Sequence, residues 1–175
     1  NVGSFNALTY TGSAQTPAAT VTIDGLTATG TWSVVTNVED VTTFTANGNF
    51  TGTIANQSTG MAKATPVVTA PVAKASLIYN TSALALADEG STTGGTMQYS
   101  LDNISWSNDI PSGTNAGDYT IYYRVVGNSN YNDVAAQSIS VSIENADMSA
   151  NITANGYNGV FDNQAHTISV NIPEG

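Results

Sequence analysis

The chain has 175 residues and a net charge of −10, with three basic side chains against thirteen acidic ones. Nucleic acids and anionic membrane surfaces require clustered lysine and arginine, so this composition excludes both as partners. The chain has no cysteine, which excludes disulfides and thiolate metal sites. Because a secreted animal module of this size would carry disulfides, the absence of cysteine also favours a bacterial or archaeal surface protein.

Period-two alternation of apolar and polar residues predicts short strands, rather than helices, in the first 64 residues. The expected strands are residues 20–23, 31–34, 42–46 and 51–55, with turns at 24–25 and 47–49. Val21 and Ile23 are expected to share one face of their strand, and Trp32 and Val34 one face of the next. Trp32 is therefore expected in the core of a first module.

The segment from Met61 to Lys74 contains Pro66 and Pro71 among small side chains. Proline removes donors from a strand ladder and stiffens the backbone. We therefore expect a short, semi-rigid connection that leads into a new first strand at Leu77.

The region from 77 to 143 has the strongest strand pattern. Its expected strands are 77–79, 84–86, 97–99, 119–126 and 138–143, with turns at 94–95 and 102–103. Within them, Tyr119 and Ile121 face inward, whereas Tyr122 and Arg124 face outward. Trp106 is expected as a further buried anchor. The last strand alternates isoleucine or valine with serine, as a sandwich strand with one dry face does.

The opening pattern of the chain recurs. Leu8-Thr9-Tyr10 returns as Leu77-Ile78-Tyr79, and a weaker copy opens at Gly156-Tyr157. Spacings of about 70 to 80 residues fit small all-β domains in tandem. The predicted organisation is an all-β chain with modules at 1–64 and 65–146 and the first strands of an incomplete third module at 147–175.

The run Ala116-Gly117-Asp118-Tyr119-Thr120-Ile121-Tyr122 resembles the penultimate strand of bacterial immunoglobulin-like surface repeats. The runs 95–102, 106–107, 110–111 and 127–131 are similar to the same repeats. The Tyr-x-Gly openings at Tyr10 and Tyr157 resemble a related group, but Thr81 replaces that glycine after Tyr79.

The resemblance implies tandem immunoglobulin-like β-sandwiches, with Tyr119 as the tyrosine corner. It also implies an extracellular stalk or spacer in a large adhesin-like cell-surface protein, with neighbouring modules as partners. It supplies no catalytic residues and no cofactor. The one histidine, His166, shares parity with Ile168 and Val170 and is expected at a strand end, so the chain is not expected to be an enzyme.

Calcium is the metal for which the sequence offers candidate ligands. Asn128, Asn130, Asn132 and Asp133 present oxygen ligands close together, although a full Asp-x-Asp-x-Asp-Gly loop is missing. Asx-turns explain these residues equally well. A lysine–asparagine isopeptide bond between Lys74 and Asn145 is a further alternative.

Two other functions remain open. Outward aromatic side chains at Tyr122 and Tyr131 are candidates for binding a host or cell-wall glycan. The strands within 147–175 expose Ile168, Val170 and Ile172 unless they are covered. If the natural chain continues, as we favour, the missing strands of the third module are expected to cover them. If the natural chain ends there, the strands within 147–175 are expected to pair with the sheet edge of another molecule and build a filament.

Overall fold

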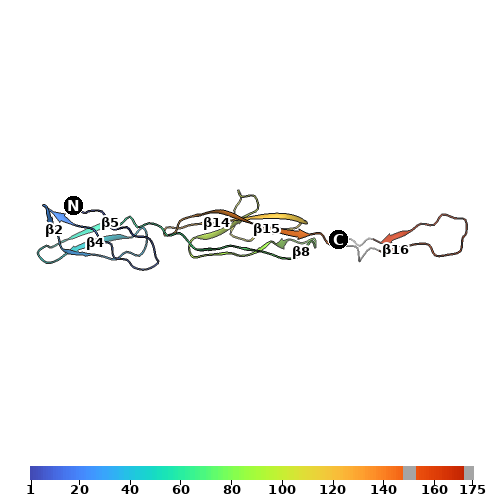
Figure 1. The fold of residues 1–175 in the computed structure, drawn as a ribbon, viewed down its shortest axis with the longest axis horizontal. Coiled ribbons are helices and arrows are strands. Elements are labelled where there is room, and N and C mark those ends of the chain that lie inside the picture. Colours follow the sequence, from blue (N-terminus) through green and yellow to red (C-terminus); the bar gives the residue numbers. More distant parts are fainter. Residues whose placement is uncertain (148–152, 172–175) are drawn as a thin grey trace.

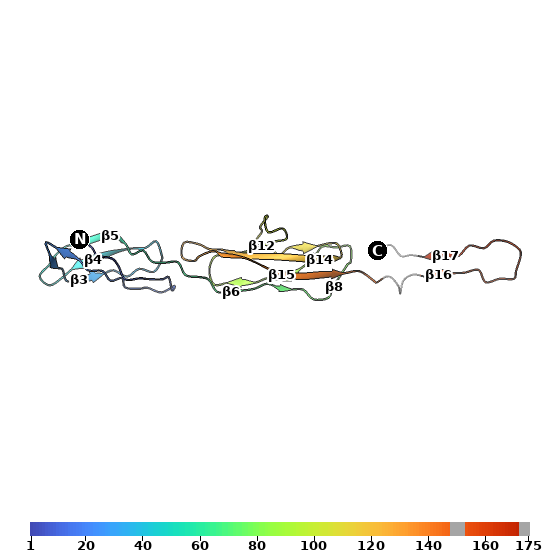
Figure 2. The same cartoon turned by 45° about the horizontal axis from the view of Figure 1, so that its top comes forward.

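The computed structural model describes residues 1–147 and 153–171. Figures 1 and 2 show two β-rich parts that follow one another along the long axis, which we name the N-terminal part (residues 1–64) and the central part (residues 65–146). A separate hairpin is formed by residues 153–171. The described residues form strands and loops, and no helix occurs among them. No described segment is therefore a helix that could span a membrane.

The strands of the N-terminal part are short. They are β1 (Thr22–Ile23), β2 (Leu26–Thr27), β3 (Gly30–Trp32), β4 (Val41–Ala46) and β5 (Thr53–Ser58). β3, β4 and β5 form one antiparallel sheet, and β1 pairs with β2. The turn between β1 and β2 is the predicted one: Asp24 and Gly25 both have positive φ, at 51° and 80°, as a two-residue hairpin turn requires.

Trp32 is the centre of a small core in the N-terminal part, as predicted. Its ring is 9% exposed, contacts Phe44 and packs edge-on against Phe5 at 4.8 Å. Its indole N–H donates to the carbonyl of Ala19 at 3.0 Å. The prediction that Val34 shares this face was wrong. β3 ends at Trp32, so the alternation shifts, and Val34 is 58% exposed.

Ile23 was expected to lie on the same face of its strand as Val21, but the two differ in burial. Val21 is buried at 2%, but Ile23 is 48% exposed. Ile23 precedes the hairpin turn directly and lies outside the hydrophobic cluster around Trp32. Alternation therefore predicts the direction of a side chain but not whether something covers it.

The central part contains ten strands. They are β6 (Val68–Thr69), β7 (Val72–Ala73), β8 (Leu77–Ile78), β9 (Leu84–Ala85), β10 (Ala87–Asp88), β11 (Ser91–Thr92), β12 (Thr96–Ser100), β13 (Ser112–Gly113), β14 (Gly117–Val126) and β15 (Val134–Glu144). One sheet has the order β12-β14-β15-β8. β9, β10 and β11 follow one another along the chain. They pair with β13, β7 and β6, respectively. The arrangement is all-β with several sheets and is compatible with a β-sandwich.

The inward positions of the two longest strands were predicted correctly. Ile121 is fully buried, and Tyr123 and Val125 lie beside it in the core together with Val141 and Ile143. Leu86 contributes from the other side of this core and is also fully buried. Such close packing is where most of the stability of a small domain arises.

Tyr119 was expected to be buried, but it is only half-buried. Its hydroxyl donates to the carbonyl of Asn115 at 2.8 Å, which keeps the end of the ring at the surface. The ring also lies against Gly113, where an added Cβ would come within 2.6 Å of the ring. This bond to a residue four positions upstream is the kind that a tyrosine corner makes.

The segment 61–74 is less of a linker than expected. Met61 is buried at 3% in the N-terminal part, and β6 and β7 already belong to the sheets of the central part. Pro66 and Pro71 are both buried. The connection itself shortens to the few residues around Lys63 and Ala64.

The hairpin at 153–171 pairs β16 (Thr153–Asn155) with β17 (Ser169–Asn171) in antiparallel fashion. Ile168 and Val170 are 68% and 53% exposed, as the sequence predicted for strands without a cover; Ile172 lies outside the described residues. His166 stacks on Tyr157 at 3.4 Å between ring centroids and contacts the carboxylate of Asp162 at 2.8 Å. Filament formation through this hairpin stays a prediction.

Thr81 has a φ of 68°, a conformation that is costly for a β-branched residue. Gly12 has a φ of 79° two residues after Tyr10, the same offset that Thr81 has from Tyr79. Thr81→Gly is therefore expected to stabilise the central part by about 0.5–1 kcal/mol, after the larger unfolded-state entropy of glycine is subtracted. Denaturant unfolding measures this, and Thr81→Ala, which keeps the Cβ, should gain less; equal gains would contradict the backbone explanation.

Candidate functional site: the junction between the two parts

The loop between β14 and β15 (residues 127–133), here the junction loop, has a fixed internal shape. The side-chain oxygen of Asn128 accepts hydrogen bonds from the N–H groups of Asn130 and Tyr131, at 2.8 and 3.0 Å. The Asp133 carboxylate accepts from the N–H of Gly127 at 2.7 Å. These are the local bonds for which asparagine and aspartate are favoured in turns, so the loop holds its own shape through its side chains.

The junction loop pairs with the connecting segment of the chain. The N–H of Ala64 donates to the carbonyl of Asn130 at 3.0 Å, and the N–H of Asn132 donates to the carbonyl of Ala64 at 2.9 Å. Lys63 extends its ammonium to the carbonyl of Asn128 at 2.7 Å. The connection is thus bonded along its length to the central part rather than free in solvent.

The same loop contacts the N-terminal part directly through Asn130. Its side-chain oxygen accepts from the N–H of Val38 at 2.9 Å, and its amide nitrogen donates to the side-chain oxygen of Asn37 at 3.0 Å. Asp40 holds that loop of the N-terminal part, because its carboxylate accepts from the N–H groups of Asn37 and Thr36 at 2.7 Å each. These bonds lower the pKa of Asp40, that from Asn37 most.

An aromatic pair completes the junction. The rings of Tyr10 and Tyr131 meet edge to face, with their centroids 5.2 Å apart, an arrangement favoured by the ring quadrupoles. Tyr131 lies on Gly94, where an added Cβ would come within 2.2 Å of the ring. Glycine at position 94 is therefore what allows Tyr131 to reach Tyr10.

The four calcium candidates come together in the junction loop, but as hydrogen-bonding groups. Oxygens of Asn128, Asn130 and Asp133 accept N–H groups, and Asn132 donates its side-chain amide to the carbonyl of Lys63 at 3.3 Å. Within residues 1–147 and 153–171, no three histidine, cysteine or acidic side chains lie close enough to hold a metal. The structure thus supports the Asx-turn interpretation of these residues.

The two glycan candidates lie in different places. Tyr131 is in the junction and half-buried there. Tyr122 is on the outward face of β14, between Ser100 of β12 and Ser138 of β15. The structure does not bring them together.

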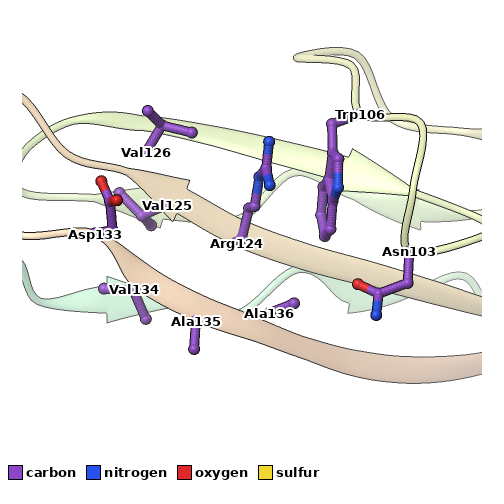
Figure 3. Close-up of a pocket in the computed structure, with 9 residues that line it drawn as sticks. All are labelled: Asn103, Trp106, Arg124, Val125, Val126, Asp133, Val134, Ala135 and Ala136. Carbon is purple, nitrogen blue, oxygen red and sulfur yellow. The ribbon is translucent and has the colours of Figure 1, made fainter.

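Trp106 was expected in the core, and that prediction was wrong. It is only partly buried and lies on the outward face of the β12-β14-β15-β8 sheet, with its ring centroid 4.2 Å from the guanidinium carbon of Arg124 (Figure 3). Trp106 follows a turn rather than lying inside a strand, so no alternation pattern in the sequence specifies its direction.

The loop that carries Trp106 is closed by reciprocal backbone hydrogen bonds between Tyr99 and Ser107, at 2.7 and 2.9 Å. The Asp102 carboxylate occupies its centre and accepts from the N–H groups of Ser105 and Ile104, at 2.7 and 2.8 Å. These bonds, that from Ser105 most, hold the pKa of Asp102 well below its usual range. The position of Trp106 is thus built by the loop itself.

Lys74, the isopeptide candidate, makes an ion pair with Asp88. The two residues lie at the paired strands β7 and β10, so the ammonium contacts a carboxylate of the neighbouring strand; the isopeptide bond to Asn145 stays a prediction. The pair is exposed and is expected to contribute little to stability.

Comparison with known proteins adds no relative: no family model, curated protein or solved structure matches the chain.

Proposed function

We propose that the chain is a non-catalytic spacer or stalk segment that holds successive immunoglobulin-like modules at a fixed angle. The observation that carries this proposal is the junction loop, which is bonded at once to the connection, through Ala64, and to the N-terminal part, through Asn37 and Val38. Domains joined by a flexible linker move relative to one another by default. Here the attachment points differ in position and chemistry, so a hinge motion would have to break several of them together.

The size of the interaction supports stiffness rather than a large gain in stability. Each partly exposed hydrogen bond contributes about 0.5–1.5 kcal/mol at most, and an edge-to-face aromatic pair contributes about 0.5–1.5 kcal/mol beyond its buried area. Together, these contributions are large enough to favour one orientation of the two parts. The stability of each part still comes mainly from its own core.

The two parts share a backbone feature that supports a tandem arrangement. The N–H of Tyr10 donates to the carbonyl of Ala62, and the N–H of Tyr79 donates to the carbonyl of Glu144, both at 2.9 Å. In each part, the segment that leads into this tyrosine thus pairs in parallel with residues near the end of the part: Thr9 with Ala62 in an isolated bridge, and β8 with β15. The last residues of each part therefore lie beside its Tyr10 or Tyr79 segment. This arrangement suits modules that are repeated in series.

The composition and the sequence resemblance together point to an extracellular bacterial surface protein of the adhesin type. Only Lys63, Lys74 and Arg124 offer basic cleavage sites, and their side chains are bonded to a carbonyl, a carboxylate and a glutamine, respectively. A chain without cysteine also has no thiol to oxidise. Both properties suit an extended protein exposed to protease and oxidant.

The proposal is tested by measuring the orientation of the N-terminal part relative to the central part. Residual dipolar couplings of the intact chain are expected to fit one alignment tensor for residues 1–146. Asn130→Ala removes both side-chain bonds to the N-terminal part, and two different tensors are expected in that variant. Asn145→Ala is the matched control, because this exposed asparagine makes no side-chain hydrogen bond within the described residues. Independent tensors in the unaltered chain would refute a rigid spacer.

A further inference from the structure

The outward face of the central part carries an aromatic group that the fold does not need for its core. Trp106 is only partly buried, and its indole N–H has no acceptor within the part of the chain that the structure describes. The other tryptophan, Trp32, buries its ring and donates its N–H to Ala19. Tryptophan usually contributes through burial together with a satisfied N–H, so the placement of Trp106 calls for a different explanation.

Arg124 is held flat beside this ring. Its Nε and one terminal nitrogen both donate to the side-chain oxygen of Gln98, at 3.1 and 2.8 Å, and the amide of Gln98 in turn contacts Asn108 at 3.3 Å. Among the described residues, no carboxylate forms an ion pair with Arg124. The guanidinium is therefore preorganised, with donors to spare, on a chain of net charge −10.

A groove of about 660 Å³ runs along this stack. Its floor is made where β14 and β15 lose register: Val125 pairs with Val134 and Tyr123 with Gln137, so Ala135 and Ala136 together face Arg124. Bulges of this kind redirect side chains beside binding sites, and two alanines leave the floor low and apolar. Figure 3 shows Arg124 and Trp106 side by side, with Ala135 and Ala136 on the neighbouring strand, lower in the view.

The polar groups at the rim are of both kinds. Asn103 lines one end of the groove and Asp133 the other (Figure 3), so the lining offers amide and guanidinium donors together with a carboxylate acceptor. This mixture over an apolar floor and beside an aromatic ring fits a ligand whose hydroxyls both donate and accept and whose C–H groups are apolar. Asp133 and the net charge of −10 disfavour an anion.

From these observations we propose that the groove along Trp106 and Arg124 binds a neutral carbohydrate. The groove lies within the size range of small-molecule sites, and its shallow form suits part of an oligosaccharide chain. The site differs from the two tyrosines that the sequence suggested, because Tyr131 is occupied in the junction and Tyr122 is not among the residues that line the groove. It also goes beyond the spacer function, since it would give the stalk a binding face of its own.

The two tryptophans provide the assay. In the ¹⁵N-labelled chain of residues 1–175, neutral gluco-, manno-, galacto- and N-acetylglucosamine oligosaccharides are titrated to about 10 mM, the range in which weak millimolar binding is seen. The indole signal of Trp106 is expected to shift with at least one of them. The signal of Trp32 should stay in place, as an internal reference for the fold.

Two variants and one control separate binding from structure. Trp106→Ala is expected to weaken binding, followed at backbone signals of β14 and β15, by about tenfold or more. Ala135→Tyr fills the floor of the groove and should prevent the shift while leaving the Trp106 signal observable and the Trp32 signal unchanged. Tyr122→Ala, an outward aromatic outside the groove, should bind as the unaltered chain does.

Three results would overturn the proposal. They are the failure of every neutral sugar to shift Trp106, a shift that survives Ala135→Tyr, and binding of uronic-acid oligomers as strong as that of their neutral counterparts. None of these results bears on the alignment of the two parts, so the spacer function and the carbohydrate site succeed or fail separately.

Discussion

Trp32→Ala is expected to unfold the N-terminal part at temperatures where the central part remains folded. The hydrophobic cluster around Trp32 in the N-terminal part is small: its buried members are Val21, Ala28, Trp32 and Phe44. Removing a buried tryptophan costs about 3–5 kcal/mol, and here it also leaves the carbonyl of Ala19 without its donor. A domain of roughly 60 residues rarely has more stability than that to lose.

Differential scanning calorimetry with near-ultraviolet circular dichroism measures this effect. The variant should show an early, low-enthalpy transition or none for the N-terminal part, with the second transition close to its original temperature. Ile121→Ala is the matched variant for the other core, since Ile121 is fully buried in the central part, and it should lower only the second transition. If each substitution lowers both transitions equally, the two cores form one cooperative unit and the description as two parts fails.

Alternation in the sequence predicted the long strands well and the short ones poorly. β14 and β15 are long enough for the two-residue period to be unmistakable, and Ile121, Val141 and Ile143 are buried as expected. Val34 was misassigned because β3 ends at Trp32, and a strand of three residues carries almost no periodic signal.

The direction of the Trp106 side chain depends on tertiary contacts, which local sequence patterns do not specify. Its loop is shaped by Asp102 and by the closure between Tyr99 and Ser107, and its ring then finds Arg124 on the outward face. Hydrophobicity predicts burial on average, but a large aromatic in a loop follows the geometry of that loop. The apolar character of Trp106 therefore gave the wrong expectation.

The junction illustrates what sequence reasoning can and cannot reach. The asparagines of the junction loop were recognised as unusual, with a calcium site and Asx-turns as the two explanations. Their partners Asn37 and Tyr10 lie about ninety or more residues away, and no local pattern connects them. Gly94 likewise looked like an ordinary turn residue, although its neighbour in space is Tyr131.

Gly94→Ala is expected to displace Tyr131 and to loosen the junction. The new Cβ would come within 2.2–2.4 Å of three ring carbons of Tyr131, far inside van der Waals contact, and that ring is already held against Tyr10. The ring must therefore move, at a cost of about 1–3 kcal/mol in the stability of the central part. Residual dipolar couplings should then require separate alignment tensors for the two parts.

The matched control is Gly156→Ala, where an added Cβ meets nothing within 4 Å and little change is expected. A double-mutant cycle identifies the cause. In a Tyr131→Ala background the ring is absent, so adding Gly94→Ala should cost much less than it does in the unaltered chain, with a coupling energy of about 1 kcal/mol or more. Additive costs would mean that Gly94 is needed for its backbone rather than for the ring, and the proposed path from Gly94 through Tyr131 to Tyr10 would be wrong.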